Sequence, residues 1–275
     1  MHEPSESVIE RRSLAFADVD GFISGIPGAG RLPERILDLY QSGGYCRGWQ
    51  VPVDFSDGVR RDLYVLVNTD FPYVPPRIVV PHGPHILAWP HLESEGFLCV
   101  LPNDAAVSSQ DPAGVVEYVL GEACRLIEDS INGRNVEDFR QEFLSYWELA
   151  ASSGSPKYIS LLEPHGPGRR VYVWRGQNRR VVGENPQSVE KWLTRWGAKK
   201  VNGQGYKLHE GVLIWLPEPL VPGEYPHTAA DVRSLARVRS SEAADVLEGL
   251  AVAGVHEIDV LLGARTANGA CFAAV

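Results

Sequence analysis

Cys99 is the residue in this chain best suited to covalent chemistry, and it lies in the segment Gly96-Phe-Leu-Cys-Val-Leu101. A thiolate is a strong nucleophile near neutral pH and needs only modest activation to exchange thioesters. Its sulfur must be exposed and yet held still. In a strand-to-loop segment, Leu98 and Val100 would turn inward as anchors while Cys99 faces solvent. Gly96 would let the backbone pass close to an incoming peptide tail.

Polar residues after the cysteine could serve the second half of such chemistry, in which an amine attacks a thioester. Asn103 and Asp104 follow closely and could orient or deprotonate an incoming lysine. The alternative is that they form a solvated turn without a chemical role. The attack creates a tetrahedral oxyanion, and each donor aimed at that charge is typically worth ~3 kcal/mol.

The same stretch also permits a metal site. Four possible zinc ligands occur in it: His82, His85, His91 and Cys99. Their spacing matches no compact zinc motif, and neighbouring prolines already explain a rigid loop. The glycines of segment 25–30 lack the Gly-Lys-Ser/Thr ending and the preceding strand of a phosphate-binding loop. We therefore predict no bound metal or cofactor and keep a zinc-binding protein as an alternative.

The composition is that of a globular protein with room for two domains. The chain has 275 residues, of which 44% are hydrophobic and 22% charged. Its longest apolar runs are far too short to span a bilayer, and its acidic N-terminus has no apolar signal core. We therefore predict a cytoplasmic protein without a membrane partner, in which four widely spaced cysteines stay reduced. Cys46, Cys124 and Cys271 are expected to be structural.

Charge is divided unevenly along the chain. Residues 1–150 contain 11 Arg, no Lys and 23 Asp or Glu, giving a formal charge of −12, whereas residues 151–275 carry +3. Phosphate backbones require clustered positive charge, so the acidic first half argues against nucleic acid as a principal partner. It suits a protein that meets basic protein surfaces.

The elements around Cys99 are predicted to be a short helix, an antiparallel meander and two further helices. Residues 32–40 have a helical apolar face and end at two glycines, and strands are expected near 51–55, 63–67 and 77–80. Asp111 is a good N-cap and Pro112 a good first residue for the next helix. A last helix is expected at about 136–150, and its aromatic residues are expected to pack in the core.

A second α+β domain is predicted after a linker at residues 151–156, which are small and polar and end in proline. A hairpin is expected around residues 171–182, helices near 186–196, 229–237 and 241–251, and strands at 212–216, 258–262 and 270–275. The predicted domains therefore span 1–150 and 157–275. Because the chain stops in an apparent strand, we expect it to be a fragment of a longer protein.

Three motifs in the first half together resemble the ubiquitin-conjugating (UBC) domain family in its prokaryotic form. That family carries Tyr-Pro-x-x-Pro-Pro, His-Pro-Asn and Gly-x-Ile-Cys-Leu in this order. The corresponding segments here are Phe71-Pro-Tyr-Val-Pro-Pro76, Trp89-Pro-His91 and Gly96-Phe-Leu-Cys-Val-Leu101. The resemblance covers about residues 20–150 and implies a UBC-like fold, with a cysteine thioester at Cys99.

In the family, the Asn of His-Pro-Asn is assigned the oxyanion-donor role. His91 occupies its place, eight positions before Cys99 as in the family pattern. An imidazole N–H can donate a hydrogen bond, so His91 either keeps that role with a new pH dependence or only braces the loop.

The second half more loosely resembles the linker domain of bacterial fusion proteins, often found in CBASS anti-phage operons, in which an activating-type adenylation domain follows. The resemblance implies that this adenylation domain or partner, not this segment, uses ATP. It would pass the C-terminus of a ubiquitin-like protein or cGAS-like nucleotidyltransferase to Cys99 for transfer to target lysines. A non-catalytic module of the same fold, which holds such a tail without reacting, is the second alternative.

Overall fold

The computed structural model describes residues 6–102, 105–151, 156–198 and 205–275, and the chain forms two compact units. The first unit is Met1–Val136 and the second is Glu137–Val275. Both combine helices with a sheet, which confirms the predicted α+β class.

The first unit carries a five-stranded antiparallel sheet in which sequential strands are neighbours, in the order β1-β2-β3-β4-β5. Its elements are α1 (Glu6–Ser24), β1 (Gly30–Arg31), α2 (Glu34–Leu37), the 3-10 helix η1 (Asp38–Gly43), β2 (Tyr45–Asp54), β3 (Arg60–Asn68), β4 (Arg77–Val79), the 3-10 helix η2 (Ser94–Gly96), β5 (Phe97–Leu98) and α3 (Pro112–Ile131). The meander β2-β3-β4 confirms the predicted antiparallel strands. The finer, UBC-like topology stays a prediction.

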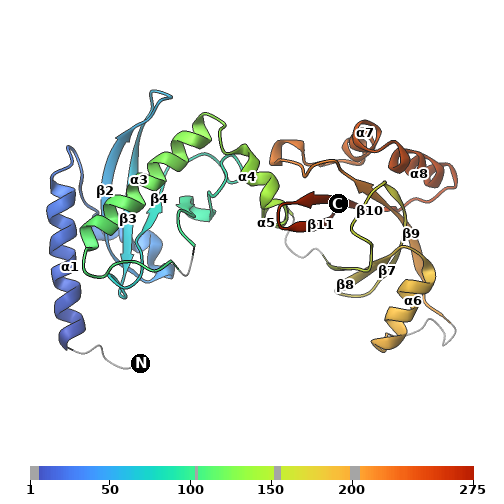
Figure 1. Ribbon diagram of the computed structural model, residues 1–275, viewed down its shortest axis with the longest axis horizontal. Helices are drawn as coiled ribbons and strands as arrows, with labels where there is room; N and C mark the ends of the chain where they lie inside the picture. The colour runs from blue at the N-terminus through green and yellow to red at the C-terminus, as the bar shows by residue number, and fades with distance from the viewer. Residues whose placement is uncertain (1–5, 103–104, 152–155, 199–204) are drawn as a thin grey trace. The chain divides into compact units, whose positions relative to one another are not determined.

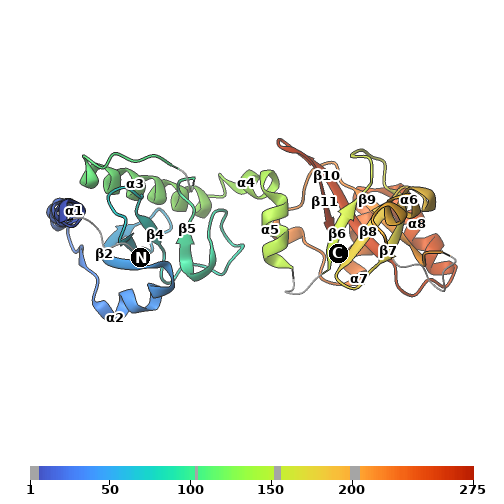
Figure 2. The ribbon, with the colours of Figure 1, turned by 90° about the horizontal axis from the view of Figure 1, so that it is seen from below.

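Two helices cover the core of the first unit, as Figures 1 and 2 show for α1 and α3. Ala15, Val19 and Ile23 of α1 are buried at four-residue spacing and pack in one cluster with Val119 and Ile127 of α3 and the sheet. Helix α3 begins as predicted, because the Asp111 carboxylate accepts the Gly114 N–H at 3.0 Å. The long helix α1 was not predicted.

The predicted helix at 32–40 is replaced by a shorter arrangement. Leu32 lies outside the helix because its N–H donates to the Gly48 carbonyl of β2 at 2.9 Å. Only Glu34–Leu37 is α-helical, and the 3-10 helix η1 follows. Burial of Leu32 and Tyr40 beneath this segment takes precedence over continuous helix formation.

The second unit carries a six-stranded mixed sheet in the order β11-β10-β9-β7-β8-β6. Its elements are α4 (Val136–Gln141), α5 (Phe143–Ala150), β6 (Lys157–Ser160), β7 (Arg169–Arg175), β8 (Arg179–Gly183), α6 (Pro186–Arg195), β9 (Leu208–Trp215), the 3-10 helix η3 (Pro222–Glu224), α7 (Ala229–Arg239), α8 (Ser241–Val252), β10 (Asp259–Thr266) and β11 (Gly269–Ala274). The hairpin β7-β8 was predicted, as were strands near β10 and β11, whereas the edge strand β6 was not. The assignment of the second unit as a linker domain stays a prediction.

The helix predicted at 136–150 is divided, because Glu142 leaves helical geometry with φ −105° and ψ 28°. After the break, Phe143 and Trp147 pack on Tyr225 with ring centroids 6.0 and 4.9 Å away. The Trp147 indole N–H also donates to the Ala274 carbonyl at 3.0 Å. These contacts explain why the structure divides the chain after Val136, earlier than the predicted boundary at residue 150.

Candidate functional site

Cys99 is exposed at the point where β5 ends. Its own backbone N–H donates to the His91 carbonyl at 2.9 Å. The preceding residue, Leu98, is 2% exposed and pairs with Ile78 of β4. The following residue, Val100, packs against the same core cluster as Leu98. The alternation expected from the sequence is therefore present, and the thiol is attached to a backbone fixed on both sides.

A tight turn holds the strand that leads to Cys99. The Glu93 N–H donates to the Phe97 carbonyl at 2.7 Å, and the turn between them places Glu95 and Gly96 at φ 60° and 83°. A Cβ on Gly96 would lie 2.4 Å from the Val80 carbonyl oxygen. Glycine is thus required here for the close approach of this segment to β4. This differs from the predicted reason, which was an approaching tail.

His91 contacts the site through its backbone. Its φ of 59° is in the left-handed region, and this conformation aims its carbonyl at the Cys99 N–H. A non-glycine residue held there costs of order 1 kcal/mol and persists only where surrounding contacts demand it. The hydrogen bond from the Cys99 N–H to the His91 carbonyl favours a role for His91 in bracing the loop. Oxyanion donation by the imidazole stays a prediction.

Asn103 and Asp104, the other two predicted site residues, lie outside the described residues. Their roles toward an incoming amine therefore stay predictions. Leu101 and Pro102, the last described residues before them, line a pocket beside Cys99.

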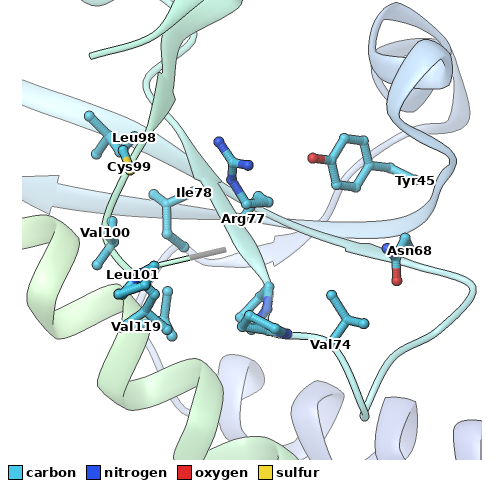
Figure 3. A pocket seen from close by; sticks show the side chains of 13 residues that line it. Tyr45, Asn68, Val74, Arg77, Ile78, Leu98, Cys99, Val100, Leu101 and Val119 are labelled. Carbon is cyan, nitrogen blue, oxygen red and sulfur yellow. The ribbon is translucent and has the colours of Figure 1, made fainter. Parts of the chain in front are cut away.

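This pocket has a volume of about 170 Å³ (Figure 3). Its walls come from four parts of the fold: the proline bend at 74–76, the start of β4, the Cys99 segment and the core-facing side of α3 at Val119. Most of the lining is apolar. Tyr45, Asn68 and Arg77 supply polar groups to the lining, and Figure 3 shows Tyr45 and Asn68 across the pocket from α3, so a peptide backbone could find hydrogen-bond partners there.

Arg77 is the cation in this lining. The β4-β5 ladder pairs Ile78 with Leu98 and Val79 with Phe97. If the register continued by one residue, Arg77 would stand opposite Cys99 on the same face of the sheet. Its guanidinium lies over the Phe97 ring, 5.3 Å from the centroid, and donates to Glu93 at 2.8 Å. These two contacts restrict where the charge can move.

Sequence reasoning missed Arg77 and Tyr45 as site residues. Arg77 could have been noticed because it directly follows the proline bend and begins a short strand. Whether it lies near Cys99 depends on the register between β4 and β5, which residue spacing alone does not predict. Burial is the main cause that raises the pKa of Tyr45, with Arg77 acting in the opposite sense. The phenol therefore stays protonated at neutral pH and can donate a hydrogen bond.

The other three cysteines are in environments that disfavour a thiolate. Burial raises the pKa of Cys124 to about 11 and also raises the pKa of Cys271. Cys46 is exposed as a residue, yet partial desolvation raises its thiol pKa, and the sulfur donates to the Val67 carbonyl at 3.7 Å. None of the three lines the pocket beside Cys99.

The zinc alternative needs its ligands in one place. Among the residues that the structure describes, which include all four candidates, no group of three or more His, Cys, Asp or Glu side chains could hold a metal ion. His82, His85, His91 and Cys99 therefore do not form a ligand set here. Likewise, no helix in the described part of the chain has the length and apolarity needed to cross a membrane.

Comparison with known protein families identifies a match to part of the chain. Residues 35–155 match the sequence model of prokaryotic E2 family B, a segment that begins in α2 and ends beyond α5. It contains Cys99, His91 and the whole pocket lining. Neither the curated proteins nor the solved structures contain a match to the chain.

Proposed function

We propose that Cys99 is the acceptor cysteine of a conjugating transferase of the ubiquitin type, because residues 35–155, which contain it, match the sequence model of prokaryotic E2 family B. In this proposal Cys99 receives the C-terminal carboxyl group of a ubiquitin-like protein as a thioester and delivers it to an amine. The observation that supports it most strongly is the exposed Cys99 thiol, on a braced strand end beside a pocket with polar groups on one side.

The first step is exchange between two thioesters. The Cys99 thiolate attacks the carbonyl carbon of a thioester on the activating enzyme, and a tetrahedral oxyanion forms. Collapse of this intermediate breaks the old carbon–sulfur bond and releases the activating enzyme's cysteine as a thiolate. One thioester is consumed and one is formed, so no further energy source is needed at Cys99.

The second step is aminolysis of the new thioester. A neutral lysine amine attacks the carbonyl, the amide bond forms, Cys99 leaves as a thiolate, and the amine loses its proton to a base or to water. Arg77, which lines the same pocket as Cys99, is proposed to contribute positive charge where negative charge develops. Each well-placed donor of this kind is worth ~3 kcal/mol.

His91, Asn103 and Asp104 have the remaining proposed roles. The His91 backbone holds the Cys99 segment, as its carbonyl contact supports, and its imidazole N–H is proposed as the oxyanion donor in place of the family's asparagine. Asn103 and Asp104 are proposed to orient and deprotonate the incoming lysine.

The partners follow from the family resemblance. We propose that an activating-type adenylation domain or protein spends ATP to load Cys99. The second unit would be the linker that precedes such a domain. The carried protein is proposed to be a cGAS-like nucleotidyltransferase or a ubiquitin-like protein, in CBASS-type anti-phage defence in the cytoplasm.

A non-catalytic module of the same fold is the alternative, favoured by the histidine that replaces the family's asparagine. To separate the two, the full chain is incubated with the activating enzyme and tail-bearing protein from the same operon plus ATP. The proposal predicts a covalent adduct that dithiothreitol removes. Cys99→Ser should give a more stable oxyester, and Cys46→Ser, an exposed cysteine outside the pocket, should behave like wild type. Tail binding without any adduct would identify the binding module.

A further inference from the structure

Three side chains in the pocket beside Cys99 carry hydrogen-bond donors: the Tyr45 hydroxyl, the Asn68 amide and the Arg77 guanidinium. They come from the start of β2, the end of β3 and the start of β4. Figure 3 shows the Tyr45 hydroxyl pointing toward Arg77. Whether one ligand can meet all three depends on the register of these strands.

The register places the three donors on one face of the sheet. Residues paired across an antiparallel ladder, and residues two apart on one strand, have side chains on the same face. The pairs that connect the strands are Tyr45–Asn68, Leu66–Arg77 and Val79–Phe97. The two-residue steps that join these pairs are Asn68–Leu66 on β3 and Arg77–Val79 on β4. The donors therefore share a face with Phe97, two residues before Cys99.

Two of the donors lie against the Phe97 ring. The Tyr45 ring stacks on it with centroids 5.6 Å apart, and the Arg77 guanidinium lies over it, 5.3 Å from the centroid. Burial is the main cause that raises the pKa of Tyr45, and the charges of Arg77 and Glu93 also act on that pKa, so the phenol lies near this ion pair. These contacts hold both donors in place before a ligand arrives, which reduces the entropy lost on binding.

Contacts within the protein leave these donors unused. Asn68 accepts the Asp70 N–H through Oδ1 at 3.0 Å, and its amide N–H groups have no partner among the described residues. Arg77 donates to Glu93 through Nη2 at 2.8 Å, and its Nε and Nη1, like the Tyr45 hydroxyl, make no hydrogen bond in the described part of the chain. None of these atoms is among the buried polar atoms that lack a partner. They are therefore open to a ligand.

The chemistry of the three groups favours a neutral acceptor. Glu93 balances the charge of Arg77, so the pocket has no excess positive charge for a carboxylate or a phosphate. Peptide carbonyl oxygens are neutral acceptors. The volume of about 170 Å³ suits a short extended segment. Two extended residues span at most about 7 Å, which is also the distance along a strand from Phe97 to Cys99. A tail attached to Cys99 can therefore bring its last carbonyl groups to these donors.

We propose that Tyr45, Asn68 and Arg77 bind main-chain carbonyl groups of the carried tail, about two residues before its terminal glycine. This inference rests on the proposed acceptor role of Cys99 and adds a requirement on the substrate. The tail must be extended and at least three residues long, and its backbone matters more than its side chains there. Binding of these carbonyl groups holds the thioester carbon beside the sulfur, which favours attack.

Two thioesters with the same leaving group test the proposal on the full chain: acetyl-Gly thioester and acetyl-Ala-Ala-Gly thioester. Both present the same glycine acyl group, so their intrinsic reactivity is similar, and only the longer one carries the upstream carbonyl groups. Intact-mass spectrometry follows the acylation of Cys99. We expect the longer peptide to react at least about tenfold faster, and acetyl-Ser-Ser-Gly thioester to react at a similar rate to the alanine peptide.

Tyr45→Phe keeps the ring that stacks on Phe97 and removes only the hydroxyl. We expect it to lower the ratio of the long-peptide rate to the short-peptide rate about fivefold, a change that a merely structural role would not produce. The matched control is Tyr64→Phe. Tyr64 packs in the same apolar cluster as Tyr45 and does not line the pocket, so this variant should keep the wild-type ratio.

The outcomes separate this inference from the proposed function. Equal rates with the short and long peptides, or equal ratios in Tyr45→Phe and Tyr64→Phe, would overturn the inference and leave Cys99 as the acceptor. A serine peptide that reacts much more slowly than the alanine peptide would overturn the assignment to the main chain. No acylation of Cys99 by any of the thioesters would instead overturn the proposed function on which the inference rests.

Discussion

Gly96→Ala tests whether the close approach of the Cys99 segment to β4 sets the geometry of the site. Gly96 has φ +83°, and Gly58, in the turn between β2 and β3, has φ +75°. An alanine at either position should cost ~1 kcal/mol for the left-handed conformation. Nothing lies within 4 Å of a Cβ on Gly58, whereas a Cβ on Gly96 would lie 2.4 Å from the Val80 carbonyl oxygen. The backbone must then shift, at an additional cost of about 2 kcal/mol.

We therefore expect Gly96→Ala to destabilise the first unit by about 3 kcal/mol and Gly58→Ala by about 1 kcal/mol. Amide hydrogen exchange measures this locally. The Val80 N–H donates to Gly96 at 2.8 Å and the Cys99 N–H to His91 at 2.9 Å, so both should exchange about 100-fold faster in Gly96→Ala. Equal destabilisation by the two variants, or unchanged exchange at Val80 and Cys99, would refute this reasoning.

Three other predictions concern thiols, a turn and the second unit. Iodoacetamide at pH 7.5, read by peptide mass spectrometry, should label Cys99 well before Cys124, whose pKa burial raises to about 11; equal labelling rates would contradict the site. A hydrogen bond from Arg61 lowers the pKa of Asp57 from 3.8 to about 2, so the stabilising contribution of this pair is complete above pH ~4 and is lost as the pH falls toward 2. An NMR titration should show Arg61→Gln returning that pKa toward 3.8, and no movement would mean that Arg61 is not the cause. Asp259→Asn should destabilise the second unit by about 3 kcal/mol in urea, because two guanidinium groups lose a buried partner. Glu257→Gln removes an exposed partner of Arg175 and should cost less than ~1 kcal/mol; equal costs would exclude a special role for burial.

Local chemistry made part of this fold predictable. Asp111 and Pro112 specify the start of α3 with two adjacent residues, and the structure contains the expected cap. The turn at Asp57 joins β2 and β3 for a similar reason, because its carboxylate accepts the Val59 N–H two residues on. The exposure of Cys99 beside a buried Leu98 follows from strand alternation.

Other parts depend on contacts between distant residues, and the sequence did not reveal them. Helix α1 places only a narrow stripe in the core and leaves Leu14 67% exposed, so its apolar pattern is weak. Strand β6 is short and pairs in parallel with β8, which requires a crossover connection rather than a local turn. The presence of Arg77 in the same pocket as Cys99 depends on how β4 and β5 pair, and the bracing by His91 is made by a backbone carbonyl that no side-chain pattern encodes.

The central claim is that the Cys99 sulfur itself accepts an acyl group, and a test without an activating enzyme addresses it most directly. The full chain is mixed with a glycine-ended peptide thioester, and intact-mass and peptide mass spectrometry locate the added acyl group. We expect one acyl group on Cys99, removed by dithiothreitol, formed equally in Cys46→Ser and not formed as a thioester in Cys99→Ser. Acylation that occurs at Cys46 instead, or a wild-type chain that gains no acyl group while Cys99 still reacts with iodoacetamide, would contradict the claim.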